Sequence, residues 1–217
     1  MTERPFENPQ PYANVMVSAY EHLASTGDPL SHIVRSIGVL EFNPDPEVFR
    51  NVCESIICQQ LSSKVADVIL KRVYATLPNG DLSPKNILDI DTSVFRKCGI
   101  SYRKIEYLKG FSGNVLYGKL DLAKLQGAGD DEAIEILTAS RGNGNWTAKM
   151  VLIFSLGRPD VLAHEDLGIR LAVKKSYGME ILPGKEQLEK IAEAWRPYRS
   201  ISSMYLWKHR DGTENIR

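Results

Sequence analysis

Residues 141 to 148 read RGNGNWTA, so two glycines separated by one residue stand directly before a helical pattern. Glycine tolerates positive φ and lets another backbone or a ligand come close, so Gly142 and Gly144 predict a tight turn. The first N–H groups of a helix have no partner within it, and a turn that opens a helix is therefore a candidate site for phosphate. A purely structural turn remains the alternative.

A second candidate is Asp166, which precedes the helical pattern LGIRLAVKKSY. A helix N-terminus favours the ionised carboxylate, and a fixed anion stabilises positive charge that develops in a transition state. Such a group can also orient or deprotonate a water molecule. An ordinary helix cap is the alternative, since aspartate is a preferred N-cap residue. Glu165 is the neighbouring acid.

The third candidate is the polar turn within SIICQQLSSKVA, which joins two apolar helical stripes. Val48, Val52 and Ile56 line the helix before it, and Val65 and Ile69 line the helix after it, at helical spacing. By period alone, Leu61 is a core residue and Gln60 caps a helix.

The elements that must position these residues are all helical. Ser83-Pro84, Ser101, Asp130 and Asp166 each begin a helical pattern, because serine and aspartate cap helices and proline suits the first turn. A last helix is expected from Ser200 to Trp207. No β-hairpin signal lies between alternating apolar runs, so the sequence predicts an all-α fold.

Composition is that of a globular protein with 217 residues and equal numbers of basic and acidic side chains, 27 of each. We expect neither a signal peptide nor a transmembrane helix, since no apolar run is long enough. The three cysteines are an odd number without metal-ligand spacing, which favours reduced thiols inside a cell.

Positive charge is nevertheless concentrated in two segments, residues 96–119 and 195–210. The first has one acid, Glu106, and the second has none. One basic face that binds nucleic acid fits this pattern, and so does a set of solvated helix faces.

Taken together, the hairpin GNG between two helices, the later Asp166 and the turn SIICQQLSSKVA resemble the helix–hairpin–helix base-excision DNA glycosylases. The 3-methyladenine DNA glycosylase II group is the most similar branch. The resemblance runs from Val48 to Trp207 and includes the C-terminal segment AWRPYRSISSMYLW. It implies a central domain at 48–156, a second domain formed by 1–47 plus 157–217, and a cleft that holds an extruded nucleotide.

The resemblance also implies residue roles. Asp166 corresponds to the essential carboxylate. A DNA phosphate would be held at the hairpin, and a wedge would enter the minor groove from the polar turn. Aromatic rings would line the base pocket, although plain core packing is the alternative for each tryptophan. These residues are Gly142, Asn143, Gly144 and Thr147 for the phosphate, Gln59, Gln60, Leu61 and Ser62 for the wedge, and Trp146, Trp207 and Tyr198 for the pocket.

Relatives that also cleave the DNA strand place a lysine at the position of Trp146, so a monofunctional enzyme is implied. Three cysteines, all before residue 99, exclude the iron–sulfur cluster of some relatives. No cofactor is expected, although Na⁺ or K⁺ on hairpin carbonyls fits the family. The implied partner is double-stranded DNA with alkylated bases or abasic sites, bound by a monomer wherever the genome lies, which is the nucleus in a eukaryote.

Several positions depart from the family pattern. Arg141 replaces proline or lysine before the hairpin, Asn143 replaces an aliphatic residue, Met150 stands where a pocket tyrosine is common, and His164-Glu165 replaces a proline–acid pair. Three hypotheses therefore stay open. The chain is a glycosylase for alkylated purines, a homologue that binds abasic or distorted DNA with little excision, or a helical protein–protein scaffold.

Overall fold

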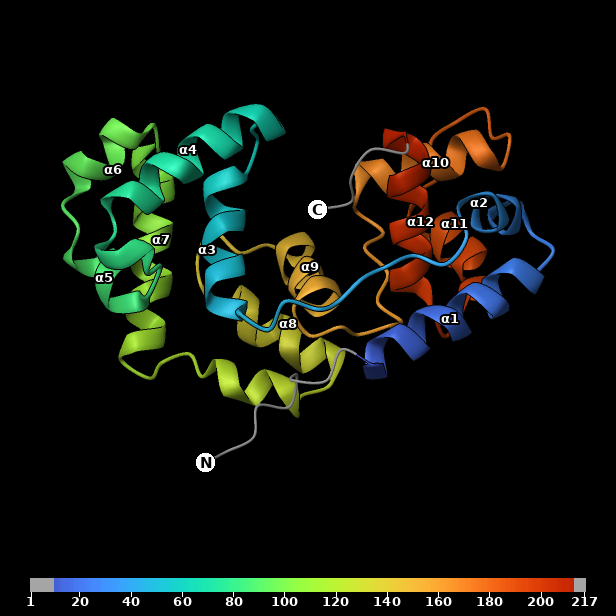
Figure 1. The fold of residues 1–217 in the computed structure, drawn as a ribbon, viewed down its shortest axis with the longest axis horizontal. Coiled ribbons are helices and arrows are strands. Elements are labelled where there is room, and N and C mark those ends of the chain that lie inside the picture. Colours follow the sequence, from blue (N-terminus) through green and yellow to red (C-terminus); the bar gives the residue numbers. More distant parts are fainter. Residues whose placement is uncertain (1–9, 213–217) are drawn as a thin grey trace. The chain divides into compact units, whose positions relative to one another are not determined.

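The computed structural model describes residues 10–212, which contain twelve α-helices, three short 3₁₀ helices and no β-strand. The predicted all-α fold is confirmed. The chain divides into two compact units, one formed by Met1–Pro46 with Leu152–Arg217 and the other by Glu47–Val151 (Figure 1). These borders differ from the expected 48 and 156 by one residue and by five, and the expected functional domains stay a prediction.

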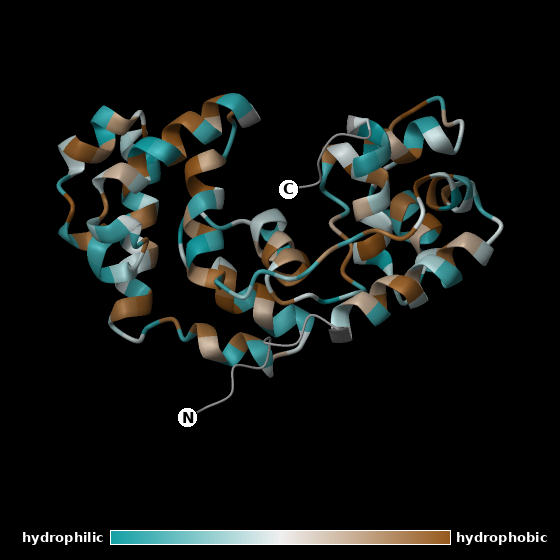
Figure 2. Cartoon of the chain, in the orientation of Figure 1, coloured by the Kyte–Doolittle hydropathy of each residue, from teal (hydrophilic) through white to brown (hydrophobic). Residues whose placement is uncertain are grey.

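The central unit is a helical bundle in which α5 and α3 pack against α7, and α4 packs against α3 and α6 (Figure 1). Its helices alternate apolar and polar faces along their length (Figure 2). Phe95 and Phe111 are fully buried in its core. The elements are α3 (Val48–Cys58), α4 (Ser63–Thr76), α5 (Pro84–Asp89), α6 (Thr92–Cys98), α7 (Tyr102–Leu116), α8 (Asp130–Thr138) and the first part of α9 (Asn145–Phe154).

The other unit joins both ends of the chain, because α12 packs against α10 from its own half and against α1 and α2 from the N-terminal segment. Trp195 and Tyr205 are its largest fully buried side chains. The indole Nε1 of Trp195 donates to Asp28 at 3.1 Å, so a polar group in this core is satisfied. The elements are α1 (Gln10–Ser25), α2 (Pro29–Ile37), α10 (Leu167–Ser176), α11 (Lys185–Ala192) and α12 (Arg199–Asp211).

Helix starts follow the sequence signals closely. Ser101 caps α7, with its hydroxyl accepting from the N–H of Lys104 at 3.3 Å, and Ser83 precedes α5 without a side-chain cap bond. The last helix begins at Arg199, one residue before the expected Ser200. The helix that opens at Asp130 ends at Thr138, earlier than the expected Gly142, because the chain turns where the N–H of Asn143 bonds to the carbonyl of Ser140.

Most cations of the two basic segments bond within the protein. Lys109 donates to the carbonyl of Ile90 at 2.7 Å, and Arg96 donates to a carbonyl in the same way. Arg196 and Arg199 form ion pairs with Asp160 at 2.8 and 2.7 Å. These side chains brace helix ends and are not part of a free basic face. None of the helices in residues 10–212 is both long and apolar enough to cross a membrane.

Candidate active site and DNA-binding turns

Asp166 caps α10 and is also bonded from α12. Its Oδ1 accepts from the backbone N–H of Ile169 at 2.8 Å and from the indole Nε1 of Trp207 at 3.0 Å. One bond comes from the next turn of its own helix, and the other comes from a residue 41 positions later. The carboxylate is therefore held by two donors on two packed helices, and the side chain is half-buried.

Trp207 ends a row of four half-buried aromatic rings in the same unit. It stacks on Phe154 at 5.7 Å between centroids, Phe154 meets Phe42 edge-on at 5.9 Å, and Phe42 meets Tyr12 edge-on at 5.3 Å. Tyr12 donates its hydroxyl to the carbonyl of Gly157 at 3.0 Å, and burial raises its pKa to about 12. The arrangement places an aromatic surface beside the candidate catalytic carboxylate.

Phe42, Phe154 and Tyr12 are not marked by any pattern in the sequence. They lie on segments far apart in the chain, and nothing local identifies three isolated aromatic residues as neighbours.

Tyr198 lies at the opposite end of α12 from Trp207. Nine residues separate them, which is about 13 Å along a helix. Its ring lies 5.6 Å from the ring of His22. The structure does not bring Tyr198 to the carboxylate, so its expected pocket role has no geometric support within this unit.

The two hairpin glycines meet different constraints. Gly142 has φ of +95°, and a Cβ there would come within 2.5 Å of the ring of Tyr107. Only glycine fits that position, because both the backbone conformation and the neighbouring ring exclude a side chain. At Gly144, no described heavy atom lies within 4 Å of the position that a Cβ would take, so this side faces open space. Internal packing therefore does not explain the second glycine.

Asn143 is directed inward. Its side chain is 6% exposed and donates to the carbonyl of Leu137 at 3.3 Å, while its N–H donates to Ser140. The expectation that this N–H holds a phosphate does not fit this geometry, since the donor already closes the turn. The Oδ1 of Asn143 is buried without a hydrogen-bond partner among the described residues.

Helical bonding in α9 begins with Ala148, whose N–H reaches the carbonyl of Gly144 at 3.0 Å. The N–H groups before Ala148, including that of Thr147, belong to the first turn, where no carbonyl of the helix precedes them. The side chain of Thr147 is 4% exposed, so any contact it makes with DNA would use its backbone. This geometry is compatible with a phosphate at the hairpin.

The polar turn after α3 contacts this hairpin. Gln59 donates from Nε2 to the carbonyl of Gly142 at 3.0 Å, so its side chain braces the turn internally. Gln60 is exposed and has φ of +60°, a conformation that non-glycine residues rarely adopt. Leu61 is half-buried, and the exposed Ser62 precedes α4 without a side-chain cap bond. Gln60 is thus the best-placed wedge candidate.

Lys104 on α7 fixes the same turn. Its Nζ donates to the carbonyls of Ile57 at 2.7 Å and Gln59 at 2.6 Å, where α3 ends. Burial lowers the pKa of this amine. A cation suits the end of a helix, where carbonyls lack partners. No local sequence signal indicates this role, because Lys104 lies 45 residues from Gln59.

The expected site residues therefore form two groups. Asp166 and Trp207 are joined in the unit of both chain ends, and the wedge turn and hairpin are joined in the central unit. Trp146, 40% exposed, belongs to the central unit. Within residues 10–212, no cluster of three or more His, Cys, Asp or Glu side chains could hold a metal ion.

Comparisons with known proteins agree with this geometry. A family model described as "HhH-GPD superfamily base excision DNA repair protein" matches residues 53–197. DNA-3-methyladenine glycosylase 1 of Schizosaccharomyces pombe is 32% identical over 198 residues, covering 89% of this chain and 87% of the relative. Alkylbase DNA glycosidase-like protein mag2 of the same organism is 27% identical over 203 residues, covering 89% and 95%.

Among solved structures, the Schizosaccharomyces pombe 3-methyladenine DNA glycosylase Mag1 in complex with abasic DNA has a TM-score of 0.81 and 30% identity. It covers 92% of this chain and 100% of its own. Helices joined by a glycine turn, followed by an aspartate that caps a later helix, define a helix–hairpin–helix protein of DNA repair. The chain belongs to the HhH-GPD superfamily of base excision DNA repair proteins, in its alkylbase DNA glycosylase branch.

Proposed function

We propose that this protein is a monofunctional DNA glycosylase that hydrolyses the N-glycosidic bond of alkylated purines such as 3-methyladenine. The observation that carries the proposal is the Oδ1 of Asp166, held by Ile169 and Trp207. A carboxylate fixed in this way needs little reorganisation when positive charge develops next to it.

In the proposed reaction, the bond between the sugar C1′ and the purine nitrogen breaks, and the base leaves with the bonding electrons. Because the alkylated purine is cationic in DNA, it leaves as a neutral base, and positive charge moves to the sugar. Asp166 stabilises that charge more than it stabilises the ground state, which is the requirement for catalysis. Water adds to C1′ and gives up a proton, which leaves an abasic site.

Trp207 supports the choice of a cationic base. Its ring stacks on Phe154 beside the carboxylate. An aromatic face attracts a cation by about 0.5–2 kcal/mol, depending on how far the pair is desolvated. An intact purine lacks this charge and would gain less.

Trp146 supports a monofunctional reaction, since lyase-competent relatives place their nucleophilic lysine at that position. The substrate places the protein with genomic DNA, which means the nucleus in a eukaryotic cell, and it is expected to act as a monomer. A Na⁺ or K⁺ ion on hairpin carbonyls also stays a proposal. The carbonyl of Gly142 already accepts from Gln59, so the ion would depend on the other carbonyls of the turn.

The second candidate is a protein that binds abasic or distorted DNA with little excision. The buried, unpartnered Oδ1 of Asn143 favours it, because the hairpin carries a polar atom where the family pattern has an apolar anchor.

The test is single-turnover release of 3-methyladenine from duplex DNA by wild type and Asp166→Asn. Asparagine keeps the oxygen that accepts both hydrogen bonds and caps a helix about as well, so folding should change little. Excision should fall by orders of magnitude while DNA binding persists. No release by saturating wild type would favour the binding protein, and an unchanged rate in the variant would make Asp166 a cap only.

A further inference from the structure

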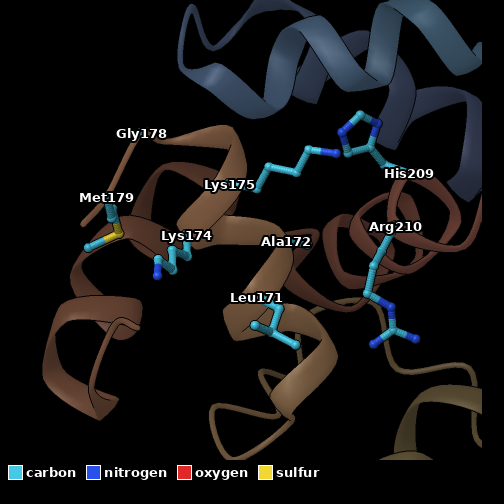
Figure 3. A pocket seen from close by; sticks show the side chains of 8 residues that line it. All are labelled: Leu171, Ala172, Lys174, Lys175, Gly178, Met179, His209 and Arg210. Atoms are coloured by element: carbon cyan, nitrogen blue, oxygen red, sulfur yellow. The ribbon is translucent and has the colours of Figure 1, made fainter. Parts of the chain in front are cut away.

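A hollow of about 540 Å³ lies between the C-terminal half of α10 and the end of α12 (Figure 3). Leu171 and Met179 supply apolar surface, and Leu171 is 44% exposed. The side chains of Lys175 and His209 extend toward one another across the hollow, and Arg210 lies near Leu171 (Figure 3). Both helices belong to the unit formed by the two chain ends.

The charge of this hollow has one sign. Lys174, Lys175, His209 and Arg210 line it, and in the described part of the chain no acidic residue does. Lys174, Lys175 and His209 form no ion pair within residues 10–212, whereas Arg196 and Arg199 do. Cations near a helix C-terminus gain from its dipole. Gathering those of two helices around one apolar surface costs repulsion, which an anionic ligand would offset.

Arg210 connects this hollow with the catalytic carboxylate. A Cβ at Gly168 would collide with the guanidinium of Arg210 and would lie 3.0 Å from the Oδ1 of Asp166. The guanidinium therefore lies against the first turn of α10, close to the carboxylate, in space that only glycine leaves open. The same side chain lines the hollow.

The length of α10 matches a nucleic-acid backbone. Lys174 and Lys175 lie eight and nine residues after Asp166, roughly 12–14 Å along a helix. Phosphates of one strand of duplex DNA are spaced about 3.4 Å along its axis, so about three or four fit this length. Arg210 would meet a phosphate near the reacting sugar, and the two lysines would meet phosphates further along.

We propose that the hollow is a second DNA-backbone site, which holds the damaged strand beside the nucleotide whose sugar reaches Asp166. This inference rests on the proposed function for the identity of the strand. Leu171 and Met179 would contact sugars of the flanking nucleotides. An acidic peptide could also satisfy these charges, but it would not account for the continuity through Arg210.

The test compares the double variant Lys174→Gln/Lys175→Gln with Lys185→Gln/Lys190→Gln. The control removes the same charge from α11 of the same unit, where both lysines are exposed. Affinity for a duplex with a stable abasic-site analogue is measured between 50 and 200 mM NaCl. Each lost phosphate contact lowers the slope of log affinity against log salt by about 0.9, so the hollow variant should lose roughly 1.8. The control should keep the wild-type slope.

A second arm shortens the damaged strand from one side of the abasic site and then from the other. Wild type should lose affinity when one flank is removed, and the hollow variant should no longer respond to that flank. Equal salt slopes in wild type and variant, or equal responses to every truncation, would overturn the inference and leave an acidic peptide as the candidate ligand. Release of 3-methyladenine by wild type is a separate readout, so this site and the proposed activity can fail independently.

Discussion

Trp207 donates its indole N–H to the same oxygen of Asp166 that accepts from the start of α10. The bond links a helix cap to the end of the row of aromatic rings. Carboxylate position and ring position are therefore coupled, and a change in one should be felt by the other.

Trp207→Phe should slow single-turnover release of 3-methyladenine by about tenfold or more, because it keeps an aromatic ring and removes the donor. A hydrogen bond to a charged group contributes about 1.5–3 kcal/mol, and partial exposure favours the lower end. Thermal unfolding of the variant identifies any loss of folding. The same change in an Asp166→Asn background should add little, since the charge that it positions is already gone. Full additivity of the two losses would contradict the coupling.

Gly142→Ala and Gly144→Val should fail in different ways. The first forces a side chain into positive φ and against Tyr107, and the conformation alone costs about 1–2 kcal/mol. Chemical denaturation should show this loss. The second substitution faces open space, so stability should stay near wild type while affinity for DNA falls, because the side chain blocks close approach of phosphate. Tight DNA binding by a folded Gly144→Val protein would exclude the hairpin as the phosphate site.

Gln60→Ala combined with Leu61→Ala should weaken binding to an abasic-site duplex much more than binding to intact duplex. These side chains would fill the gap left by an extruded nucleotide, and intact DNA has no such gap. Competition gel shifts with the two duplexes measure the ratio. Gln59→Ala is a useful comparison, since it removes a brace to Gly142 and should lower both affinities. A uniform loss in the double variant would mark Gln60 and Leu61 as structural.

Lys104→Met should destabilise the central unit by about 1–3 kcal/mol, because two carbonyls lose their donor while the apolar stem is kept. Affinity for abasic DNA should fall with it, since the turn that carries Gln60 loosens. Lys109→Met is the matched control, because Lys109 also donates to a carbonyl from α7 but does so far from the wedge turn. Equal effects on DNA binding would argue against a specific role of Lys104.

Tyr12→Phe should alter stability at alkaline pH. Burial raises the pKa of Tyr12 from 10.0 to about 12, so the folded state favours the neutral phenol. This contribution is complete below pH 10 and is lost as the pH rises toward 12, where the folded state must bury a phenolate. Urea unfolding should therefore show a steeper loss between pH 10 and 12 for wild type than for the variant. Parallel curves would refute the shift.

Local signals predicted much of the molecule. The cap at Asp166, the turn at Gly142 and the start of α7 at Ser101 depend on residues within a few positions, and all are present. The polar turn was located correctly, but its internal division was not visible. Gln59 turns inward because the acceptor, the carbonyl of Gly142, lies 83 residues away.

The charged segments show the limit more clearly. From the sequence, Lys104 and Arg199 are two members of basic runs. In the structure, Lys104 holds a helix end and Arg199 is paired with Asp160. Both partners come from distant segments, so only the tertiary arrangement decides which cations stay available for an anion.

The bonds from Lys104 to the turn and from Gln59 to the hairpin have a consequence for local dynamics. They tie α7, the wedge turn and the hairpin together through a few donors, so opening any one of these segments leaves carbonyls of another unsatisfied. Such segments open cooperatively, and their amide protons should exchange with solvent at similar, matched rates. A ligand that orders the hairpin would then slow exchange in the wedge turn without touching it.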